Sequence, residues 1–588
     1  MRWLAVGVGA LVVLALVAGG WIAWRARDAR SHLAAAAALM PTLQTEIQND
    51  DRAAARSTLA ILQDHARAAR ADVSDPVWRA GTRVPGVGPD LAAVAAVATA
   101  ADGLAEDVMP PLVAVAGDLD PAALAPHQGR IALGPITRAA PQVVAADTAI
   151  RRAEAGLAAI DVGRLRPEVR SGVVDFRTRL ARAAATTATA ARAAQLLPPM
   201  LGADGRRTYL VVFQNLAEVR ATGGMFGAYA VITADHGQVR IDSQGTAATD
   251  LRAFDTPVLP LDPAMKALYT DRLGRYPADV NFSPDFPAAA KLAREMYRRR
   301  SGRTVDGVLA TDPVALSYVL AGTGPVAVPG GAALTSQNAV RALLSDSYAA
   351  PTSLAEKDQY FAAAARTIFG AMAAGTGNPR AVLAGLVRAA AERRLLVWSG
   401  HDAENTTIHG TVLDGALPLH DGATPTVGVF LNDGTGAKLG YYLRPSADVA
   451  AGDCLADGRR RLKLTVTLGS AAPARGLTTD VLGLALGGKP YTIRTNVLVF
   501  SPTGGGIGEA LVDGRKVHIG TGTDHQRSVG VLTVYLLPGT QKKIEFSLFT
   551  DVYPQTQNAS PGIDLRLTPT VNPWKIHSQV VSPCRVAR

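Results

Sequence analysis

The sequence of 588 residues is longer than one hydrophobic core usually organises, so we expect two or three folded domains. Lys and Arg outnumber Asp and Glu by 60 to 50, but the excess is scattered along the chain and aromatic residues make up only 5% of it. Nucleic-acid-binding proteins concentrate basic residues and interleave them with aromatic ones, so this composition argues against a nucleic-acid partner.

The first long segment is the run WLAVGVGALVVLALVAGGWIAW, from Trp3 to Trp24, which carries no charge and has Trp at both ends. A helix rises about 1.5 Å per residue, so a run of this length spans the roughly 30 Å hydrocarbon layer of a membrane. The run exceeds the apolar region of a signal peptide, and AWRARDA is a poor cleavage site. We therefore expect an uncleaved single-pass anchor with a short flank in residues 1–27.

The charges that flank this run do not agree on its orientation. Arg25 and Arg27 follow the run, and the positive-inside rule taken literally would keep the body of the chain in the cytoplasm. Long domains translocate largely regardless of charge, however, and the two cysteines suit an oxidising compartment. We expect a cell-membrane protein with the bulk of its chain extracytoplasmic.

Residues 28–200 are dominated by Ala, Arg, Leu and Asp. Apolar residues such as Leu43, Ile47, Leu59 and Leu62 recur at helical spacing, and the charges fall mostly between them. Prolines divide the region into several amphipathic helices. We predict a helical bundle or stalk, and we assign it no chemistry because bundle packing alone explains the pattern.

A new domain, residues 201–445, is expected where Pro198 and Pro199 stop the last of these helices and TYLVVF begins a strand. The strand-like segments GAYAVITAD, VDGVLAT and PVAV then alternate with the helical segments SPDFPAAAKLAREMYRRR and DPVALSYVLAG. This alternation is typical of an α/β layered domain. Further on, NDGTGAK between VGVFLN and KLGYYLR predicts a hairpin at Asp433-Gly434.

In residues 446–588 the helical pattern vanishes, and short alternating strands follow one another with turn residues between them. This spacing predicts an immunoglobulin-like β-sandwich. Cys454 and Cys584 bracket the segment, and a bond between them would close a long loop and stabilise the fold by roughly 4–5 kcal/mol in the chain-entropy model. The alternative is two unrelated buried thiols. The expected fold class is thus multidomain α+β: a transmembrane helix, an Ala-rich bundle, an α/β domain and a β-sandwich.

The chain contains no G-x-S-x-G, H-E-x-x-H or Walker-type motif, so serine hydrolysis, zinc proteolysis and nucleotide hydrolysis lack support. The strongest candidate is NLAEVRATGGMF, where Arg220 precedes Gly223 and Gly224. A guanidinium beside backbone N–H groups can hold a phosphate or a carboxylate. The alternative is that Glu218 pairs with Arg220 while the glycines make a tight entry into a strand.

The block VVFQNLAEVRATGGMFGAYAVITADHGQVRI, with VDGVLATDPVALSYVLAGTGPVAV and KLGYYL downstream, resembles the bacterial membrane-anchored family catalogued as domain of unknown function 4012. The resemblance covers roughly residues 201–444, and its Q-N-x-x-E-x-R-A-T-G-G core is quite specific. Membership implies a single N-terminal anchor, an envelope location and no established reaction.

A second resemblance is to the LytR-CpsA-Psr phosphotransferases, which attach glycopolymers to the cell wall from polyprenyl-pyrophosphate donors. It implies that Arg220 stands at the arginine of that family's R-x-D-T, Asp255 at the acid of its R-D-T, and Asp358 at the acid of its charged helix. Thr222 stands where the family has Asp, and Phe254 where it has Arg. Both departures weaken the handling of magnesium and pyrophosphate.

The loop DRLGRYPADVNFSPDF supplies three more charged candidates for ligand binding, Arg272, Arg275 and Asp285. We expect an envelope protein that binds an anionic glycan or a polyprenyl-phosphate-linked precursor and assists polysaccharide assembly. One alternative is an active phosphotransferase that attaches glycopolymer to the wall, and Mg²⁺ would be its cofactor; binding alone requires none. The other alternative is a structural scaffold for envelope proteins, whose identity the sequence leaves open.

Overall fold

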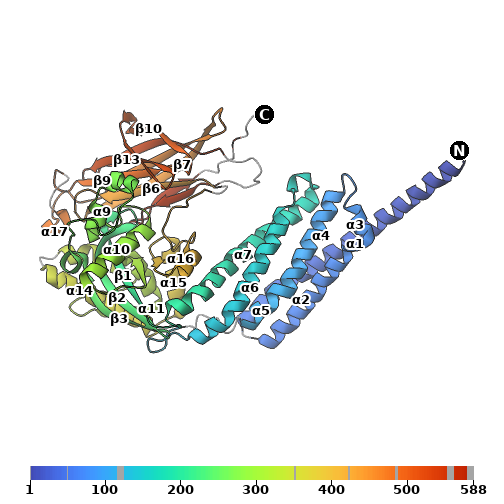
Figure 1. The fold of residues 1–588 in the computed structure, drawn as a ribbon, viewed down its shortest axis with the longest axis horizontal. Helices are drawn as coiled ribbons and strands as arrows, with labels where there is room; N and C mark the ends of the chain where they lie inside the picture. Colours follow the sequence, from blue (N-terminus) through green and yellow to red (C-terminus); the bar gives the residue numbers. More distant parts are fainter. Residues whose placement is uncertain are drawn as a thin grey trace. The chain divides into compact units, whose positions relative to one another are not determined.

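The computed structural model describes residues 2–49, 51–115, 125–349, 353–421, 424–483, 488–552, 562–578 and 584, and the side chains of these residues except 2–15, 48, 115 and 354. The chain divides into two compact units (Figure 1). The first consists of residues 1–124 and 132–204, and the second of residues 125–131 and 205–588.

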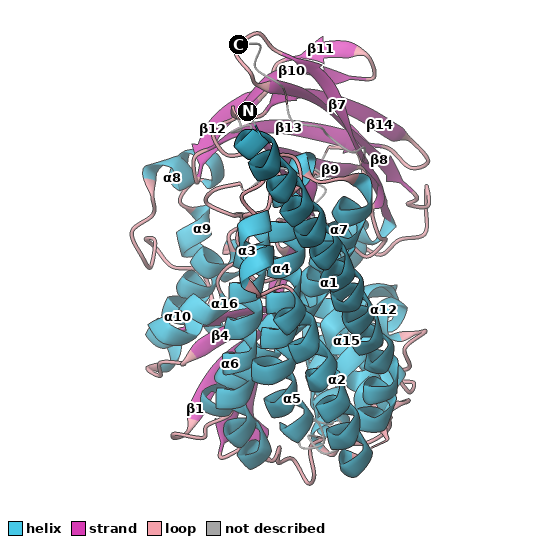
Figure 2. Cartoon of the chain, turned by 90° about the vertical axis from the view of Figure 1, so that its right-hand side faces the viewer, coloured by secondary structure: helices cyan, strands magenta, loops and turns pink. Residues whose placement is uncertain are grey.

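The first unit is built from helices that lie side by side (Figure 2). Their bounds are α1 (Arg2–Gln48), α2 (Arg52–Asp72), α3 (Pro76–Gly81), α4 (Gly88–Gly103), α5 (Met109–Val115), α6 (Leu133–Ala158) and α7 (Pro167–Met200). Leu43 of α1 is buried with Leu59 and Leu62 of α2 in one apolar cluster, as their helical spacing predicts. Pro198 and Pro199 do not stop α7 but occupy its last turn.

The predicted transmembrane anchor is wrong. Within the described part of the chain, no helix has the length and apolar character that crossing a bilayer requires. The side chains of residues 2–15 lie outside the described residues. At the described end of the apolar run, the indole Nε1 of Trp21 donates to Asp75 (3.1 Å), and the guanidinium of Arg25 lies 4.9 Å and 5.3 Å from the ring centres of Trp21 and Trp24. These tryptophans therefore contact charged groups of the same unit.

The second unit begins with a mixed five-stranded sheet in the order β3-β2-β1-β4-β5. Its strands are β1 (Arg207–Arg220), β2 (Gly223–Asp235), β3 (Gln238–Thr246), β4 (Gly307–Thr311) and β5 (Leu396–Ser399). β1 pairs antiparallel with β2 and parallel with β4. The predicted strands GAYAVITAD and VDGVLAT are thus observed, whereas in PVAV only Val326 makes a single bridge, to Leu334.

The helices of this unit differ widely in length. Their bounds are α8 (Pro263–Tyr269), α9 (Arg272–Arg275), α10 (Phe286–Ser301), α11 (Pro313–Thr323), α12 (Ala339–Arg341), α13 (Ser347–Ala349), α14 (Leu354–Ala373), α15 (Pro379–Ala391), α16 (Asp402–Ile408) and α17 (Thr479–Leu482). Asp312 caps α11 as expected, since its Oδ1 accepts from the backbone N–H of Ala315 at 2.8 Å. The helix ends at Thr323 with Gly324 as its C-cap, rather than at Gly322. Gly322 instead permits close packing, since a Cβ there would lie 2.4 Å from the backbone nitrogen of Val382 in α15.

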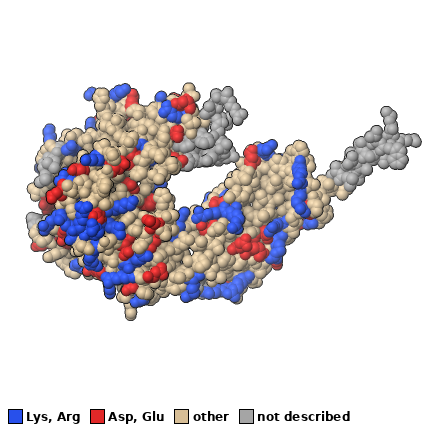
Figure 3. Space-filling view, viewed as in Figure 1, with Lys and Arg blue, Asp and Glu red and all other residues tan. Residues whose placement is uncertain are grey.

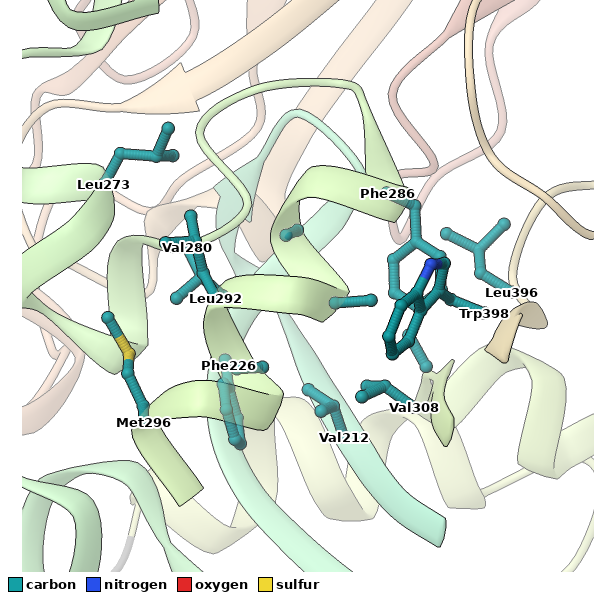
Figure 4. Packing of buried hydrophobic residues seen from close by; sticks show 14 of the residues in the cluster. Val212, Phe226, Leu273, Val280, Phe286, Leu292, Met296, Val308, Leu396 and Trp398 are labelled. Carbon is teal, nitrogen blue, oxygen red and sulfur yellow. The ribbon is translucent and has the colours of Figure 1, made fainter. Parts of the chain in front are cut away.

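Helix α10 covers the core of the five-stranded sheet (Figure 4). Leu292 and Met296 of α10 are buried with Val212 of β1 and Phe226 of β2. Fully burying one such side chain stabilises the fold by roughly 1.5–3 kcal/mol. The amphipathic spacing of this helix therefore positions it on the sheet and fixes where its N-terminus lies.

Basic side chains gather where α10 lies on the visible face of the molecule (Figure 3). Arg298 and Arg299 pair with Glu295, each at 2.8 Å, within the same helix. Arg300 donates to the carbonyl of Leu251, and its guanidinium lies 4.3 Å from the ring centre of Phe254. Arg299 also donates to the carbonyl of Val258, so Arg299 and Arg300 hold the segment that precedes α8 against the end of α10 and serve the fold.

The remaining strands form two sheets, β11-β10-β14-β8-β7-β16 and β12-β13-β9-β6-β15. Their bounds are β6 (Thr426–Asp433), β7 (Leu443–Cys454), β8 (Arg460–Ser470), β9 (Ile493–Phe500), β10 (Gly506–Val512), β11 (Arg515–Val517), β12 (Gly520–Asp524), β13 (Arg527–Leu536), β14 (Gln541–Phe549), β15 (Asp564–Leu567) and β16 (Lys575–Ser578). One apolar cluster joins the two sheets, with Val466 and Phe546 from one and Val497 from the other. The pairs β15/β6 and β16/β7 are parallel, unlike those of an all-antiparallel immunoglobulin-like sandwich.

The predicted hairpin at Asp433-Gly434 is also wrong, because β6 and β7 belong to different sheets. The carboxylate of Asp433 instead accepts from the backbone N–H groups of Thr435 (3.0 Å) and Gly436 (2.6 Å) and so shapes a turn that leaves β6. The predicted disulfide is confirmed: Cys454 and Cys584 are bonded, with their Cα atoms 5.6 Å apart.

Candidate functional site

Arg220, at the end of β1, is buried and already paired. Its Nη2 donates to Oδ1 of Asp279 at 3.1 Å, and its Nη1 donates to the carbonyl of Val219 at 3.0 Å. The guanidinium also lies 4.8 Å from the ring centre of Phe282. Arg272 binds the other oxygen of the same carboxylate at 2.7 Å. Two of the predicted ligand-binding arginines therefore meet, but they meet on a buried aspartate of the protein itself.

The other polar residues of the Arg220 motif are engaged in the same way. The Thr222 hydroxyl accepts from the side-chain amides of Gln214 and Asn281, both at 3.0 Å. Glu218 pairs with Lys438 at 2.8 Å, not with Arg220 as one alternative proposed. The motif thus ties the ends of β1 and β2 to later segments of the chain.

Gly223 and Gly224 are required by close backbone packing. Gly223 has φ +140°, which side-chain-bearing residues rarely adopt. A Cβ on Gly224 would lie 2.2 Å from the backbone carbon of Asn215. This geometry fits the tight entry into β2 that the sequence left open as an alternative.

The remaining predicted residues do not gather around Arg220. Asp255 is exposed in a loop, and Arg275 donates to Asp271 (3.3 Å) and to the carbonyl of Phe254 (3.1 Å). Asp358 is half-buried on α14, and burial, together with the nearby carboxylate of Asp250, raises its pKa. Among the described residues, Asp285 is the predicted site residue that lines a cavity.

This cavity has a volume of about 200 Å³ and brings together the start of α10, the segment that follows α16, and the β12–β13 turn. Its polar wall consists of Asp285, His409, Asp524 and His525. Its apolar wall consists of Pro284, Pro287, Ala416, Leu417 and Leu419. A cavity with one apolar wall and a few convergent polar groups is the usual form of a small-molecule site.

His525 lies between the two carboxylates of the polar wall. Its Nδ1 contacts Oδ1 of Asp524, and its Nε2 lies 3.6 Å from Oδ2 of Asp285. The hydrogen bond with Asp524 raises the pKa of His525, and burial raises the pKa of Asp285. Oδ2 of Asp524 is buried without a hydrogen-bond partner among the described residues. The cavity is therefore lined by groups that titrate.

The backbone that presents His525 is strained. His525 and Gln526 have φ +48° and +61° at the two central positions of the hairpin turn, where Asn-Gly is the usual choice. Arg527, fully buried behind the turn, donates to Asp421 (2.6 Å) and to the carbonyl of Pro418 (2.7 Å). Residues held in such conformations by their surroundings cluster at functional sites.

A second cavity, of about 20 Å³, adjoins the first, since Pro284, Ala416 and Leu417 line both. Its remaining wall consists of Ala221, Thr222, Arg393, Leu396, Gly415, Phe430, Arg566, Leu567 and Pro569. The Arg220 motif therefore does reach this site, through the two residues that follow the arginine. We call the two cavities together the groove, with an acid–His end and an arginine end.

The sequence did not indicate most of the groove. Only the hairpin TDHQRS carries a local signal, because it places His525 and Gln526 at turn positions that favour Asn and Gly. Arg393 and Arg566 carry no such signal, since their proximity depends on how β15 and the end of α15 are brought together. Within the described ranges, no group of three or more His, Cys, Asp or Glu residues is arranged to hold a metal ion.

The fold and the groove define a class: a mixed α/β protein whose candidate site lies between a helix-covered sheet and one of the two further β-sheets of the same unit. Residues 204–348 match the family model described as "Protein of unknown function (DUF4012)", the family that the sequence resembles. The match includes the Arg220 motif and Asp285 but ends before Asp358. No curated protein matches the chain. The resemblance to the LytR-CpsA-Psr phosphotransferases stays a prediction.

Proposed function

We propose that the protein is an extracytoplasmic binding protein for a cell-envelope glycan and that the groove is its binding site. The observation that carries this proposal is the acid–His end, where Asp285, Asp524 and His525 line a cavity of about 200 Å³ together with prolines and leucines. Carboxylates accept hydrogen bonds from sugar hydroxyls, and an imidazole can donate or accept them. The apolar wall suits the less polar face of a sugar ring.

The size of the cavity favours the end of a glycan chain or a single sugar. Small-molecule sites commonly enclose roughly 300–1,000 Å³. A cavity of about 200 Å³ is smaller and suits one ring. A glycan carried on polyprenyl phosphate would present such a ring together with a phosphate, so the lipid-linked precursor remains part of the proposal.

The disulfide supports the location. Cys454 and Cys584 are bonded, and disulfides persist in oxidising compartments outside the cytoplasm. A phosphotransferase finds less support, because Arg220 and Arg275, its expected phosphate-binding residues, already pair with Asp279 and Asp271.

The test is binding of the full chain to an array of neutral and acidic cell-envelope polysaccharides, followed by calorimetry on those retained. We expect at least one to bind and Asp285→Asn or His525→Gln to weaken it by roughly tenfold, the effect of losing a hydrogen bond to a charged group. His236→Gln is the matched control: His236 has φ +48° and its Nδ1 lies 2.6 Å from Asp235, as in the His525 turn, but both residues are exposed.

Binding that all variants share would place the glycan elsewhere and contradict the proposed site. If no polysaccharide binds, the scaffold alternative gains support, and capture of the same envelope protein by the wild type and by His525→Gln would establish it.

A further inference from the structure

We infer that the arginine end of the groove is an oxyanion subsite, which takes a carboxylate or phosphate group carried by the sugar whose ring occupies the acid–His end. The inference rests on the proposed function and names the class of glycan that the groove selects. The sequence led us to expect an anionic ligand at Arg220. The structure supports an anionic ligand through other residues, Arg393 and Arg566.

Three hydrogen-bond donors line this small cavity. Arg393 and Arg566 carry guanidinium groups, and Nε of Arg566 already donates to Asp564 at 2.6 Å, which leaves its other N–H groups for a ligand. Thr222 contributes a hydroxyl that already accepts from Gln214 and Asn281, so its own proton is left for a third partner. The rest of the wall is largely apolar. Donors that converge within apolar surroundings favour an acceptor that carries negative charge.

Among the described residues, no hydrogen bond or ion pair involves the side chain of Arg393, and the acids that attract its charge are Asp564 and Asp414. Both acids have closer partners than Arg393: Asp564 accepts from Arg566 at 2.6 Å, and Asp414 accepts from two backbone N–H groups, at 2.7 Å and 3.0 Å. Burial lowers the pKa of Arg393, because desolvation disfavours its charged form. A bound anion would supply the missing partner.

The backbone at Arg393 has a conformation that favours glycine. The backbone N–H of Arg393 donates to the carbonyl of Ala390, and the N–H of Arg394 donates to the carbonyl of Ala389. This pair of hydrogen bonds is the Schellman motif, which ends α15. Arg393 occupies its left-handed position, with φ +56°, where glycine is the usual residue. An arginine at this point sacrifices stability, as residues at binding sites often do.

The sizes of the two cavities match the two parts of such a ligand. About 20 Å³ exceeds the roughly 10–15 Å³ that one water molecule needs, so the small cavity has room for one oxygen of an anionic group but not for a ring. The larger cavity, of about 200 Å³, adjoins it and can hold the ring. An acidic sugar bound across both would place its charge against Arg393 and its hydroxyls against His525.

Calorimetric titration of the full chain with glucose, D-glucuronate and glucose 6-phosphate tests the inference. We expect one or both acidic sugars to bind at least tenfold more tightly than glucose, and the preferred one distinguishes a carboxylate from a phosphate ligand. Arg393→Gly should abolish the preference while the melting temperature stays the same or rises, because glycine suits the left-handed position. Arg252→Gly is the matched control, since exposed Arg252 has φ +53°.

Equal affinity for glucose and both acidic sugars, or a preference that survives Arg393→Gly, would overturn the subsite. Two further results would distinguish a failure of the subsite from a failure of the proposed function. If sugars bind through His525 without regard to charge, the glycan function stands and the subsite falls. If inorganic phosphate alone binds through Arg393 while no sugar binds, the subsite stands and the glycan function falls.

Discussion

His525 is held between two carboxylates that come from distant parts of the chain. Asp524 precedes it in the β12–β13 turn, whereas Asp285 begins α10. Asp262, at the start of α8, also raises the pKa of His525, and Lys291 opposes the rise in the pKa of Asp285. The protonated imidazole is therefore favoured by acids on three elements.

The stability of the second unit should consequently fall as pH rises. A histidine whose folded pKa lies above its ordinary 6.5 contributes stability that is complete below that value and is lost as pH rises through the folded pKa. The raised pKa of Asp285 acts with the same sign, because its contribution is lost as pH rises from 3.8 through its folded value. His525→Gln should remove the upper part of this dependence.

Urea unfolding of the wild type and His525→Gln between about pH 5.5 and 8.5 measures the effect. The wild type should be the more stable protein at low pH. Because His525 is partly exposed, we expect the difference in free energy of unfolding between the wild type and His525→Gln to shrink by on the order of 1 kcal/mol as pH rises. His236→Gln, at an exposed turn of the same geometry, should show no such trend. A difference between wild type and His525→Gln that grows with pH would contradict the assignment.

The partner of Arg220 likewise depends on tertiary contacts and could not be predicted from the sequence alone. Glu218 stands two positions before it, yet the strand is irregular between Asn215 and Val219, and a bulge redirects side chains. Glu218 thus meets Lys438, and Arg220 meets an aspartate 59 positions away.

Between strands β1 and β2, the close approach at Gly224 is a sharp constraint. Gly224→Ala would place a Cβ against backbone atoms of Asn215, at 2.2 Å, which cannot move aside as a side chain can. We expect the free energy of unfolding to fall by roughly 1–3 kcal/mol or more, as for overpacked sites. Gly227→Ala in the same strand is the control, since its Cβ would lie 3.9 Å from the end of Met225.

Urea denaturation of the two glycine variants provides the comparison. Gly227→Ala should unfold near the wild-type midpoint, and Gly224→Ala clearly below it. Equal midpoints would show that β1 and β2 can separate without cost, and the tight packing assigned to the motif would then be wrong.

Helices and strands were predictable where the pattern is local. The segment of α11 carries its own cap at Asp312, and β2 and β4 carry their own apolar runs. Asp433 and Gly434 are also typical turn residues, but the strands on either side of them, β6 and β7, pair in two different sheets that share one apolar core. Local turn chemistry cannot decide between a hairpin and a crossing, since both require a turn.

At the scale of the whole molecule, the disulfide joins the end of β7 to Cys584 across a sequence separation of 130. Closing a loop of this length should stabilise the folded state by roughly 4–5 kcal/mol in the chain-entropy model, although measured values are often smaller. The Cys454→Ser and Cys584→Ser double variant should therefore unfold at lower urea concentration than the oxidised wild type.

Reduction provides the internal control for this prediction. A reductant should lower the unfolding midpoint of the wild type to that of the double variant and leave the double variant unchanged. If the reductant lowers both alike, the loss of stability comes from something other than the bond between Cys454 and Cys584.

The groove is itself a property of the whole second unit. The turn with His525, the end of α15 with Arg393, and the start of α10 with Asp285 are separated by more than a hundred residues in sequence. They meet because the strands after residue 425 form two sheets and one of them is packed against the helix-covered sheet, with Phe430 and Phe500 in its core cluster.

The sequence by itself determined features that depend on local pattern: the helices of the first unit, the strands of the Arg220 motif and the family model that residues 204–348 match. It favoured a bond between Cys454 and Cys584, which the structure confirms. Only the tertiary structure decided that Arg220 lies in a buried ion pair, that no described helix suits a membrane span, and that β6 and β7 enter different sheets. The physical reason is that burial and charge pairing depend on which distant segments meet, and side-chain spacing along one segment carries no information about its partners.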